Sequence, residues 1–526
     1  MRAKEPSNYY LCSFLLSWKV GENLDDSKSI LNYLKKPMYV RRRILLDYDE
    51  VTPNNVIEVL QKALNIHNAN ARECDYLIRY FLGDQDILYR PAPTTSEINN
   101  TTVVNYAFPI TREIVGYTLG NPIELVAKNS DKQKDVQQLN DMYDYEAAYL
   151  TDVCANIYSS VCGVGYQITL PSSEINKDNT PDIPIVNDYL DPRTTFVVQS
   201  NTIGTPQIMS CTIIKKRDGK RIYHCYTDKY KMVVEAMSKV TTTFNPIGMD
   251  PITMLENSVF LTGDWEQAIS VMNASNLVAS DRLNDIEGTI RSLLVVLGAE
   301  FDDEEDASLK KIKSNRLLTL VSPAGTNVDA KFISPTLDSI GVQNIQDYLD
   351  DARNIITGIP DRENNGGAGG DTGMAVLNRN GWTDIEIVAK LKELFIKKAK
   401  KRQLAVALRI LKQLDLISDD LNVIDIDTTI GRHTMDNLST KASAFSTLVA
   451  TGELATIDAL ELSGLTNRVA EMVDRGKKAK EERQKEAIKL AKQAADASGE
   501  GDSSSSNGAN KTAEIEKQAS GNNDKK

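Results

Sequence analysis

The sequence is poor in the residue types on which much enzyme and metal chemistry depends. Its 526 residues include three histidines and six cysteines, and no two cysteines form a C-x-x-C pair. Scattered cysteines favour free, buried thiols in a reducing compartment over a secreted disulfide framework. The histidines, His67, His224 and His433, lie far apart and lack the H-E-x-x-H spacing, so they predict ordinary structural contacts. We therefore expect no metal site.

Phosphate-binding and nucleophile motifs are also missing. The glycine-rich stretch 366–373 is not followed by the Lys-Ser or Lys-Thr of a nucleotide-binding loop, which favours a mobile loop over a phosphate cradle. No G-x-S-x-G elbow occurs. The acidic run 300–306 lacks the alternating ligands and the glycine of a calcium loop, so a solvated face is favoured over a cation site. We expect neither a cofactor nor an enzymatic activity.

Long hydrophobic runs are absent as well. The apolar stretch at residues 9–16 is too short to cross a bilayer and lacks a small-residue cleavage site, which predicts a soluble protein or a part of a soluble assembly. Acidic residues outnumber basic ones by 73 to 61, for a net charge of −12. This charge argues against a protein that binds DNA tightly by neutralising phosphates, but it suits a surface along which DNA slides.

The chain is long enough for several domains, and its pattern changes along its length. Helical periodicity marks residues 54–82, 103–119 and 131–158. Residues 163–260 are rich in β-branched and aromatic residues, which predicts an antiparallel β region of roughly 100 residues. Within it, Asp218-Gly219 is typical of a two-residue hairpin turn.

Two long helices are expected next, with an insert between them. Apolar residues spaced 3-4-3-4 from Leu283 to Leu297 predict one face of a helix that starts near Asp264. Ser334-Pro335 is a favourable start for a second helix, which runs to Gly358. The insert between the helices contains strand-like runs at 317–321 and 328–333. We expect this insert to form a small helix with a hairpin. The insert also carries four basic residues that fit either an acidic or nucleic-acid partner or plain solvation. They are Lys310, Lys311, Lys313 and Arg316.

A polar, glycine-rich loop at residues 361–371 precedes an amphipathic pattern over residues 374–414. Gly381 is the natural place for this long helix to kink. Residues 423–430 alternate like a strand and are expected to return to the β region, and helices follow over 438–474. From residue 476 the composition predicts a disordered tail after a solvated helix at 477–495.

With these segments in order, the sequence resembles the portal proteins of tailed bacteriophages, specifically the siphophage-type portal family. The resemblance covers roughly residues 55–475 and rests on five stretches whose order and spacing are specific. They are residues 79–88 (RYFLGDQDIL), 114–123 (IVGYTLGNPI), 263–266 with 279–287 (GDWE and ASDRLNDIE), 357–361 through 373–377 (TGIPD and GMAVL), and 448–473. One departure is Asp371-Thr372-Gly373, where the family usually has Ser-Gly before the long helix.

The resemblance implies an α+β, mainly helical portal fold with wing, stem, clip and crown, assembling as a ring. The implied segments are an N-terminal segment 1–50, wing 51–263, stem helix 264–299, clip 300–334, stem helix 335–358, tunnel loop 359–373, long kinked helix 374–415, return strand 416–436, crown 437–475 and polar tail 476–526.

The resemblance also implies a function. About twelve subunits would form a channel at one capsid vertex, through which double-stranded DNA is packaged by the terminase and later ejected. The ring would assemble in the host cytoplasm, remain in the virion, and bind the terminase large subunit, the major capsid and scaffolding proteins and the head–tail connector proteins. The basic quartet of the insert would lie on the clip surface that docks terminase or connector. The channel would be lined by Asp361, Arg362, Glu363, Asn364, Asn365, Gly366 and Gly367.

Two other interpretations stay open. A nucleotide-driven DNA translocase would need a phosphate-binding loop, which the sequence lacks. A different virion structural or scaffold protein would be expected to be extended and mostly helical, whereas residues 163–260 predict strands. A kink at Gly381 that couples the loop to the crown predicts that Gly381→Ala impairs packaging and leaves rings intact.

Overall fold

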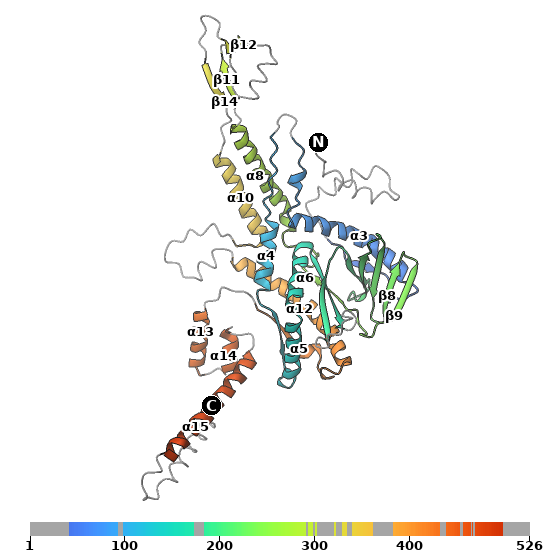
Figure 1. Ribbon diagram of the computed structural model, residues 1–526, viewed down its shortest axis with the longest axis vertical. Helices are drawn as coiled ribbons and strands as arrows, with labels where there is room; N and C mark the ends of the chain where they lie inside the picture. Colours follow the sequence, from blue (N-terminus) through green and yellow to red (C-terminus); the bar gives the residue numbers. More distant parts are fainter. Residues whose placement is uncertain are drawn as a thin grey trace. The chain divides into compact units, whose positions relative to one another are not determined.

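The chain divides into two units, which are described separately: residues 1–434 and residues 435–526. The computed structural model describes residues 41–92, 98–172, 184–290, 293–297, 300–301, 320–321, 329–333, 339–360, 382–431, 438–452, 456–463, 465 and 469–497. Figure 1 shows these elements with their labels. Within them the fold is mainly helical with several small sheets, as expected.

The N-terminal helices agree with the sequence pattern apart from one break and a start at Ala107 in place of the predicted residue 103. Helix α3 covers Val56–Phe81 and α4 covers Ala107–Thr118, with the short η1 (Asp86–Tyr89) between them. The single helix predicted over 131–158 is wrong: η2 (Ser130–Lys132) leads into α5 (Gln133–Tyr145), and α6 (Ala148–Cys162) follows. Ala147 adopts a left-handed conformation at φ 56°, which ends one helix and redirects the chain into the next.

A six-stranded sheet packs against α3. Its strands are β1 (Ile44–Leu46), β5 (Thr195–Ser200), β6 (Gln207–Lys215), β7 (Arg221–Tyr226), β8 (Tyr230–Glu235) and β9 (Lys239–Phe244), in spatial order β1-β5-β6-β7-β8-β9. Only the β1–β5 pair in this sheet is parallel. Val56, Leu60 and Leu64 of α3 share a buried cluster with Phe196 and Met232 of the sheet. The predicted hairpin at Asp218-Gly219 is confirmed, with Gly219 at φ 82°, but the connection is longer than the predicted two-residue turn because residues 216–220 separate β6 from β7.

A second sheet and the long helix form another core. The sheet consists of β10 (Ile252–Glu256), β3 (Val164–Pro171) and β4 (Ile185–Leu190), in that order. Helix α12 (Trp382–Gln413) buries Leu404 and Leu411 in the same cluster as Ile168 of β3. Helix α6 approaches β3 so closely that a Cβ on Gly165 would lie 2.2 Å from the carbonyl oxygen of Ala155. Glycine is therefore required there.

The strand predicted over 423–430 forms, but its partner differs from the expectation. After η4 (Val423–Asp425), β15 (Ile426–Ile430) pairs antiparallel with β2 (Ile123–Ala127). It thus returns to the segment proposed as the wing, yet not to the β region 163–260. Local alternation predicts a strand but carries no information on its partner.

The first long helix is shorter than predicted. After η3 (Glu266–Ala268), α8 covers Ile269–Ile290, and Leu293–Leu297 form strand β11. β11 pairs with β14 (Asp329–Ile333), and β12 (Glu300–Phe301) pairs with β13 (Leu320–Val321). The predicted helix to residue 299 and the predicted hairpin between the runs 317–321 and 328–333 are therefore wrong. A run of Leu and Val residues is compatible with a buried strand as well as with one face of a helix. The pairing with β14 makes this run a strand.

Helix α10 (Ser339–Thr357) packs beside α8 (Figure 1). The second unit contains α13 (Leu438–Ala450), α14 (Thr456–Ser463) and α15 (Val469–Ala497). The predicted boundary between crown and tail at residues 475–476 lies inside α15. No helix in the described part of the chain is both long and apolar enough to cross a membrane.

Candidate assembly face and loop base

The residues that the sequence singled out for the channel and the clip lie outside the described residues. They are Asp361, Arg362, Glu363, Asn364, Asn365, Gly366 and Gly367 of the loop, Lys310, Lys311, Lys313 and Arg316 of the insert, and Gly381. The described residues include the helices and strands that flank these segments. These flanking elements show how the glycine-rich loop is attached to the fold.

The described residues on either side of segment 361–381 lie against each other. Helix α10 ends at Thr357, and Gly358 follows with φ 68°. A Cβ on Gly358 would lie 3.0 Å from Cγ2 of Val388, in the second turn of α12. Ile359 and Val388 pack against the same buried cluster. The chain therefore leaves and re-enters the folded body at one place, which we call the loop base.

Buried ion pairs hold α12 in position next to the loop base. Lys392 Nζ lies 2.5 Å from Asp264 Oδ2, and the two side chains are 6% and 7% exposed. Asp264 also accepts hydrogen bonds from Ser160 Oγ at 2.5 Å and from Asn257 Nδ2 at 2.8 Å. Further along α12, Lys400 pairs with Asp152 at 2.9 Å. Paired and hydrogen-bonded in this way, buried charges are tolerated, and each fixes the helix to a different element.

The Gly263-Asp264-Trp265-Glu266 stretch joins β10 to α8. Trp265 is fully buried, stacks on Tyr80 of α3 at 5.5 Å between ring centroids, and donates a hydrogen bond from Nε1 to Thr111 Oγ1 of α4 at 2.9 Å. Glu266 accepts from Gly263 N at 2.8 Å and pairs with Arg41. The motif noted in the sequence therefore joins α3, α4, α6 and α12 to the start of α8.

One face of α8 carries a row of polar residues that the sequence analysis missed. Asn276, Ser280 and Asn284, four residues apart, hold the extended segment 98–105 along the helix. Asn276 Oδ1 accepts from Val104 N at 2.7 Å, Ser280 Oγ accepts from Thr102 N at 2.9 Å, and Asn284 Oδ1 accepts from Asn100 N at 2.7 Å. The spacing of four residues is visible in the sequence, but the backbone N–H that donates each bond is remote from its acceptor along the chain.

Apolar side chains remain exposed on two helices. On α10, Ile340, Tyr348 and Ile355 are 75%, 70% and 81% exposed and lie within about 80° of one another around the helix axis. We call these three residues the α10 face. The sequence pattern predicts exposed apolar stripes on the helices at 264–297 and 335–356, and Ile340 and Ile345 of the second stripe are exposed in the single subunit. On α12, a similar stripe at i, i+4 and i+7, the α12 face, is also exposed: Ile387, Leu391 and Leu394.

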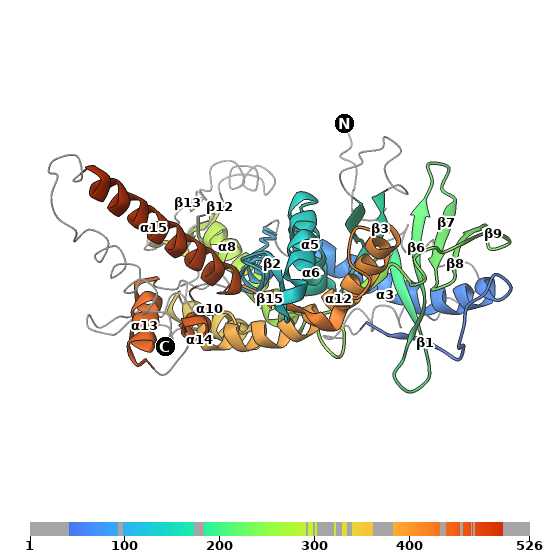
Figure 2. The same cartoon turned by 90° about the horizontal axis from the view of Figure 1, so that it is seen from below.

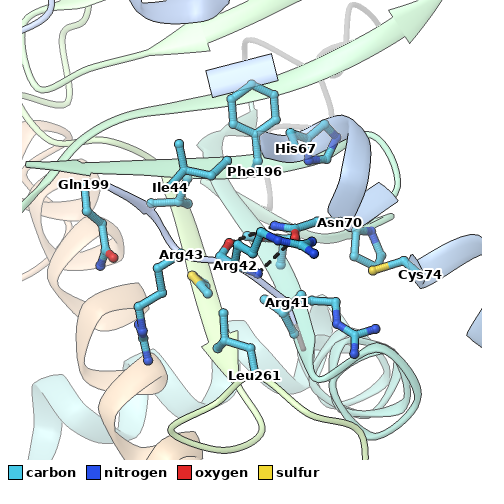
Figure 3. A pocket seen from close by; sticks show the side chains of 15 residues that line it. Arg41, Arg42, Arg43, Ile44, His67, Asn70, Cys74, Phe196, Gln199 and Leu261 are labelled. Atoms are coloured by element: carbon cyan, nitrogen blue, oxygen red, sulfur yellow. Dashed lines mark hydrogen bonds between the residues drawn. The ribbon is translucent and has the colours of Figure 1, made fainter. Parts of the chain in front are cut away.

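A pocket lined by three arginines lies at the start of the described chain (Figure 3). Arg41 pairs with Glu266, Arg42 with Glu73 at 3.0 Å, and Arg43 with Glu256. Figure 3 also shows the bonds between Arg42 and Asn70: Arg42 N donates to Asn70 Oδ1 at 2.9 Å, and Asn70 Nδ2 donates to Arg42 O at 2.8 Å. Because carboxylates already neutralise these arginines, the pocket is a structural junction. Within the described residues, no group of His, Cys, Asp and Glu side chains could hold a metal ion.

The buried His67 in this pocket should make the free energy of unfolding depend on pH. It packs on Phe196 at 4.5 Å between ring centroids, donates from Nε2 to Arg193 O at 3.1 Å, and burial lowers its pKa to about 4. Since the unfolded pKa is about 6.5, its contribution is complete above pH 6.5 and is lost as the pH falls toward 4, by about 3 kcal/mol in all. Urea unfolding of wild type and His67→Gln at pH 7, 5.5 and 4.5 measures it. Equal pH slopes in both proteins would contradict this assignment.

One of the comparisons with known proteins identifies a family. A search of the curated proteins finds no match. Among solved structures, the chain matches a chain of "Neck of empty GTA particle computed with C6 symmetry" with a TM-score of 0.44 and 12% identity, covering 75% of this chain and 94% of that one. The family model described as "Phage portal protein, SPP1 Gp6-like" matches residues 60–486, most of the chain. The chain therefore belongs to the SPP1 Gp6-like family of phage portal proteins and is a portal protein, which forms the channel at a capsid vertex.

Proposed function

We propose that about twelve copies of this chain form a closed ring that conducts double-stranded DNA and performs no catalysis of its own. The observation that carries the ring is the exposure of the α10 and α12 faces. Burying an aliphatic or aromatic side chain is worth about 1.5–3 kcal/mol, so two such faces per subunit favour side-by-side association of copies. The ring belongs to the virion and assembles in the host cytoplasm.

We propose the tunnel loop, residues 359–373, as the part of each subunit that meets the DNA. Its anchored base supports this role, because a loop held at both ends by α10 and α12 can move at its tip without moving its root. Asp361, Arg362, Glu363, Asn364 and Asn365 would touch the backbone weakly, and Gly366 and Gly367 would supply mobility. A kink at Gly381 would transmit the loop's movement along α12.

The clip is proposed as the docking surface for other proteins. It is the insert between α8 and α10, and the β11–β14 pair supports it as a stable base for a projecting tip. Lys310, Lys311, Lys313 and Arg316 would bind the terminase large subunit during packaging and head–tail connector proteins afterwards. The terminase would supply ATP hydrolysis, since this sequence contains no phosphate-binding loop. The wing would face the major capsid and scaffolding proteins.

Native mass spectrometry of the purified protein tests the proposed ring. With a subunit of 58.3 kDa, a twelve-membered ring has a mass of about 700 kDa. Negative-stain images of the same sample should show rings with a central hole wide enough for a duplex, and the rings alone should not hydrolyse ATP. Monomers or open filaments at micromolar concentration, or ATP hydrolysis by the pure protein, would count against the proposal.

A further inference from the structure

The tip of the β6–β7 hairpin is strongly basic, although the whole chain is acidic. Residues 215–221 contain five basic side chains and one acidic one, a net charge of 5 − 1 = +4, in a protein of net charge −12. All seven residues are exposed. The basic residues are Lys215, Lys216, Arg217, Lys220 and Arg221.

The backbone holds these charges in a defined arrangement. Lys216 N donates to Lys220 O at 2.9 Å, and Gly219 N donates to Lys216 O at 3.0 Å. Asp218 Oδ1 accepts from Lys220 N at 3.1 Å, which fixes the turn. Figure 2 shows β6 and β7 side by side with β8 in the sheet. The tip is therefore a short two-stranded ribbon anchored in the sheet.

The register of the hairpin brings like charges together. Lys215 is paired directly with Arg221, and Lys216 lies opposite Lys220 in the next pair. Like charges directly opposite each other in a sheet are destabilising. Two consecutive pairs of this kind break a local rule of sheet design, and such violations are expected at functional positions.

Nearby carboxylates compensate only part of this charge. Lys216 lies 3.8 Å from Glu235 and Lys220 lies 3.3 Å from Asp218, both in exposed pairs of small energetic value. Lys215, Arg217 and Arg221 have no ion-pair partner among the residues that the structure describes. These three side chains are available to an anion from outside the subunit.

We propose that this hairpin binds the backbone phosphates of duplex DNA, at a surface separate from the channel loop. A two-stranded ribbon with strands about 4.8 Å apart is narrow enough for the roughly 12 Å major groove. An acidic protein partner is less favoured because tight protein interfaces are anchored by buried aromatic or apolar residues, and the seven tip residues include none. The partner is the genome that the portal conducts.

Binding at this tip is independent of base sequence and sensitive to salt. Each phosphate neutralised by a lysine or arginine releases condensed counterions, so three side chains contribute about 2.7 to the slope of log K against log salt concentration. One hairpin binds weakly, but repeated copies in a ring add their contacts through avidity. The hairpins would hold DNA near the ring without adding any contact to DNA inside the channel.

A closed circular duplex tests the proposal, because it cannot enter a closed ring's channel. The assembled protein is titrated with a fluorescent minicircle between 25 and 200 mM salt. The variant is Lys215→Gln with Arg217→Gln and Arg221→Gln. The matched control, Lys62→Gln with Lys128→Gln and Lys229→Gln, removes the same charge from three exposed lysines that already bind Glu58, Ile424 O and Glu50. We expect the hairpin variant to lower the magnitude of the salt slope by roughly 2–3 for each hairpin that contacts the minicircle, and the control by less than about 1 per subunit in contact.

Several outcomes would overturn the proposal. They are equal salt slopes for the hairpin variant and wild type, no minicircle binding at 25 mM salt, or binding of poly-glutamate with no binding of the minicircle, which would assign the tip to an acidic protein. Ring formation is measured on the same samples by native mass spectrometry. A failed hairpin proposal with intact rings thus leaves the portal function unaffected.

Discussion

Replacing Tyr348 and Ile355 by aspartate should convert the assembled portal into monomers without unfolding the subunit. Both side chains belong to the α10 face and are mostly exposed in a single subunit, so aspartate there costs the isolated fold little. In a ring the same positions would be buried, where each loses about 1.5–3 kcal/mol of apolar burial and an unpaired carboxylate adds a further penalty. Two changes at every interface should weaken each contact by at least roughly 100-fold.

Sedimentation velocity measures the assembly state, and circular dichroism with thermal unfolding checks the fold. The matched control is Leu150→Asp with Leu414→Asp, which changes two exposed apolar residues that lie off the α10 and α12 faces. We expect rings from the control and monomers of wild-type secondary structure from the α10 variant. Rings formed by the α10 variant would show that this face is not a subunit contact.

Lys392→Met should destabilise the fold around the start of α12 by about 3–5 kcal/mol. The substitution leaves Asp264 as a buried carboxylate without its cation, which costs far more than the loss of an exposed pair. The comparison variant is Lys398→Met on the same helix. Lys398 pairs with Glu256 at 3.0 Å, but its side chain is 72% exposed and Arg43 also binds Glu256, so its removal should cost less than about 1 kcal/mol.

Urea unfolding followed by tryptophan fluorescence reports on this region because Trp265 is buried next to Asp264. The double variant Lys392→Met, Asp264→Asn should recover part of the loss, since a neutral amide can still bond with Ser160 and Asn257. A cost below about 1 kcal/mol for Lys392→Met, or no recovery in the double variant, would mean that this pair does not anchor α12.

Local pattern predicted the elements where one period was unambiguous. The four-residue spacing of Val56, Leu60 and Leu64 predicted α3, and Asp218-Gly219 predicted the hairpin turn. The local pattern predicted the wrong element at Leu293–Leu297, because these five apolar residues fit both a helix face and a strand. The pairing with β14 distinguishes a strand from a helix here. The local pattern also missed the break at Ala147, because a left-handed alanine has no sequence signal.

The sequence by itself determined the mainly helical α+β character, the order of the segments and the membership in the portal family, since periodicity, turn chemistry and motif order are local properties. The candidate channel and clip residues were also read from it, and they remain predictions. Only the tertiary structure decided what holds the loop base. Lys392 and Asp264 are 128 residues apart, and Gly358 meets Val388 across the loop. Such pairings depend on how distant elements pack, which no local period encodes.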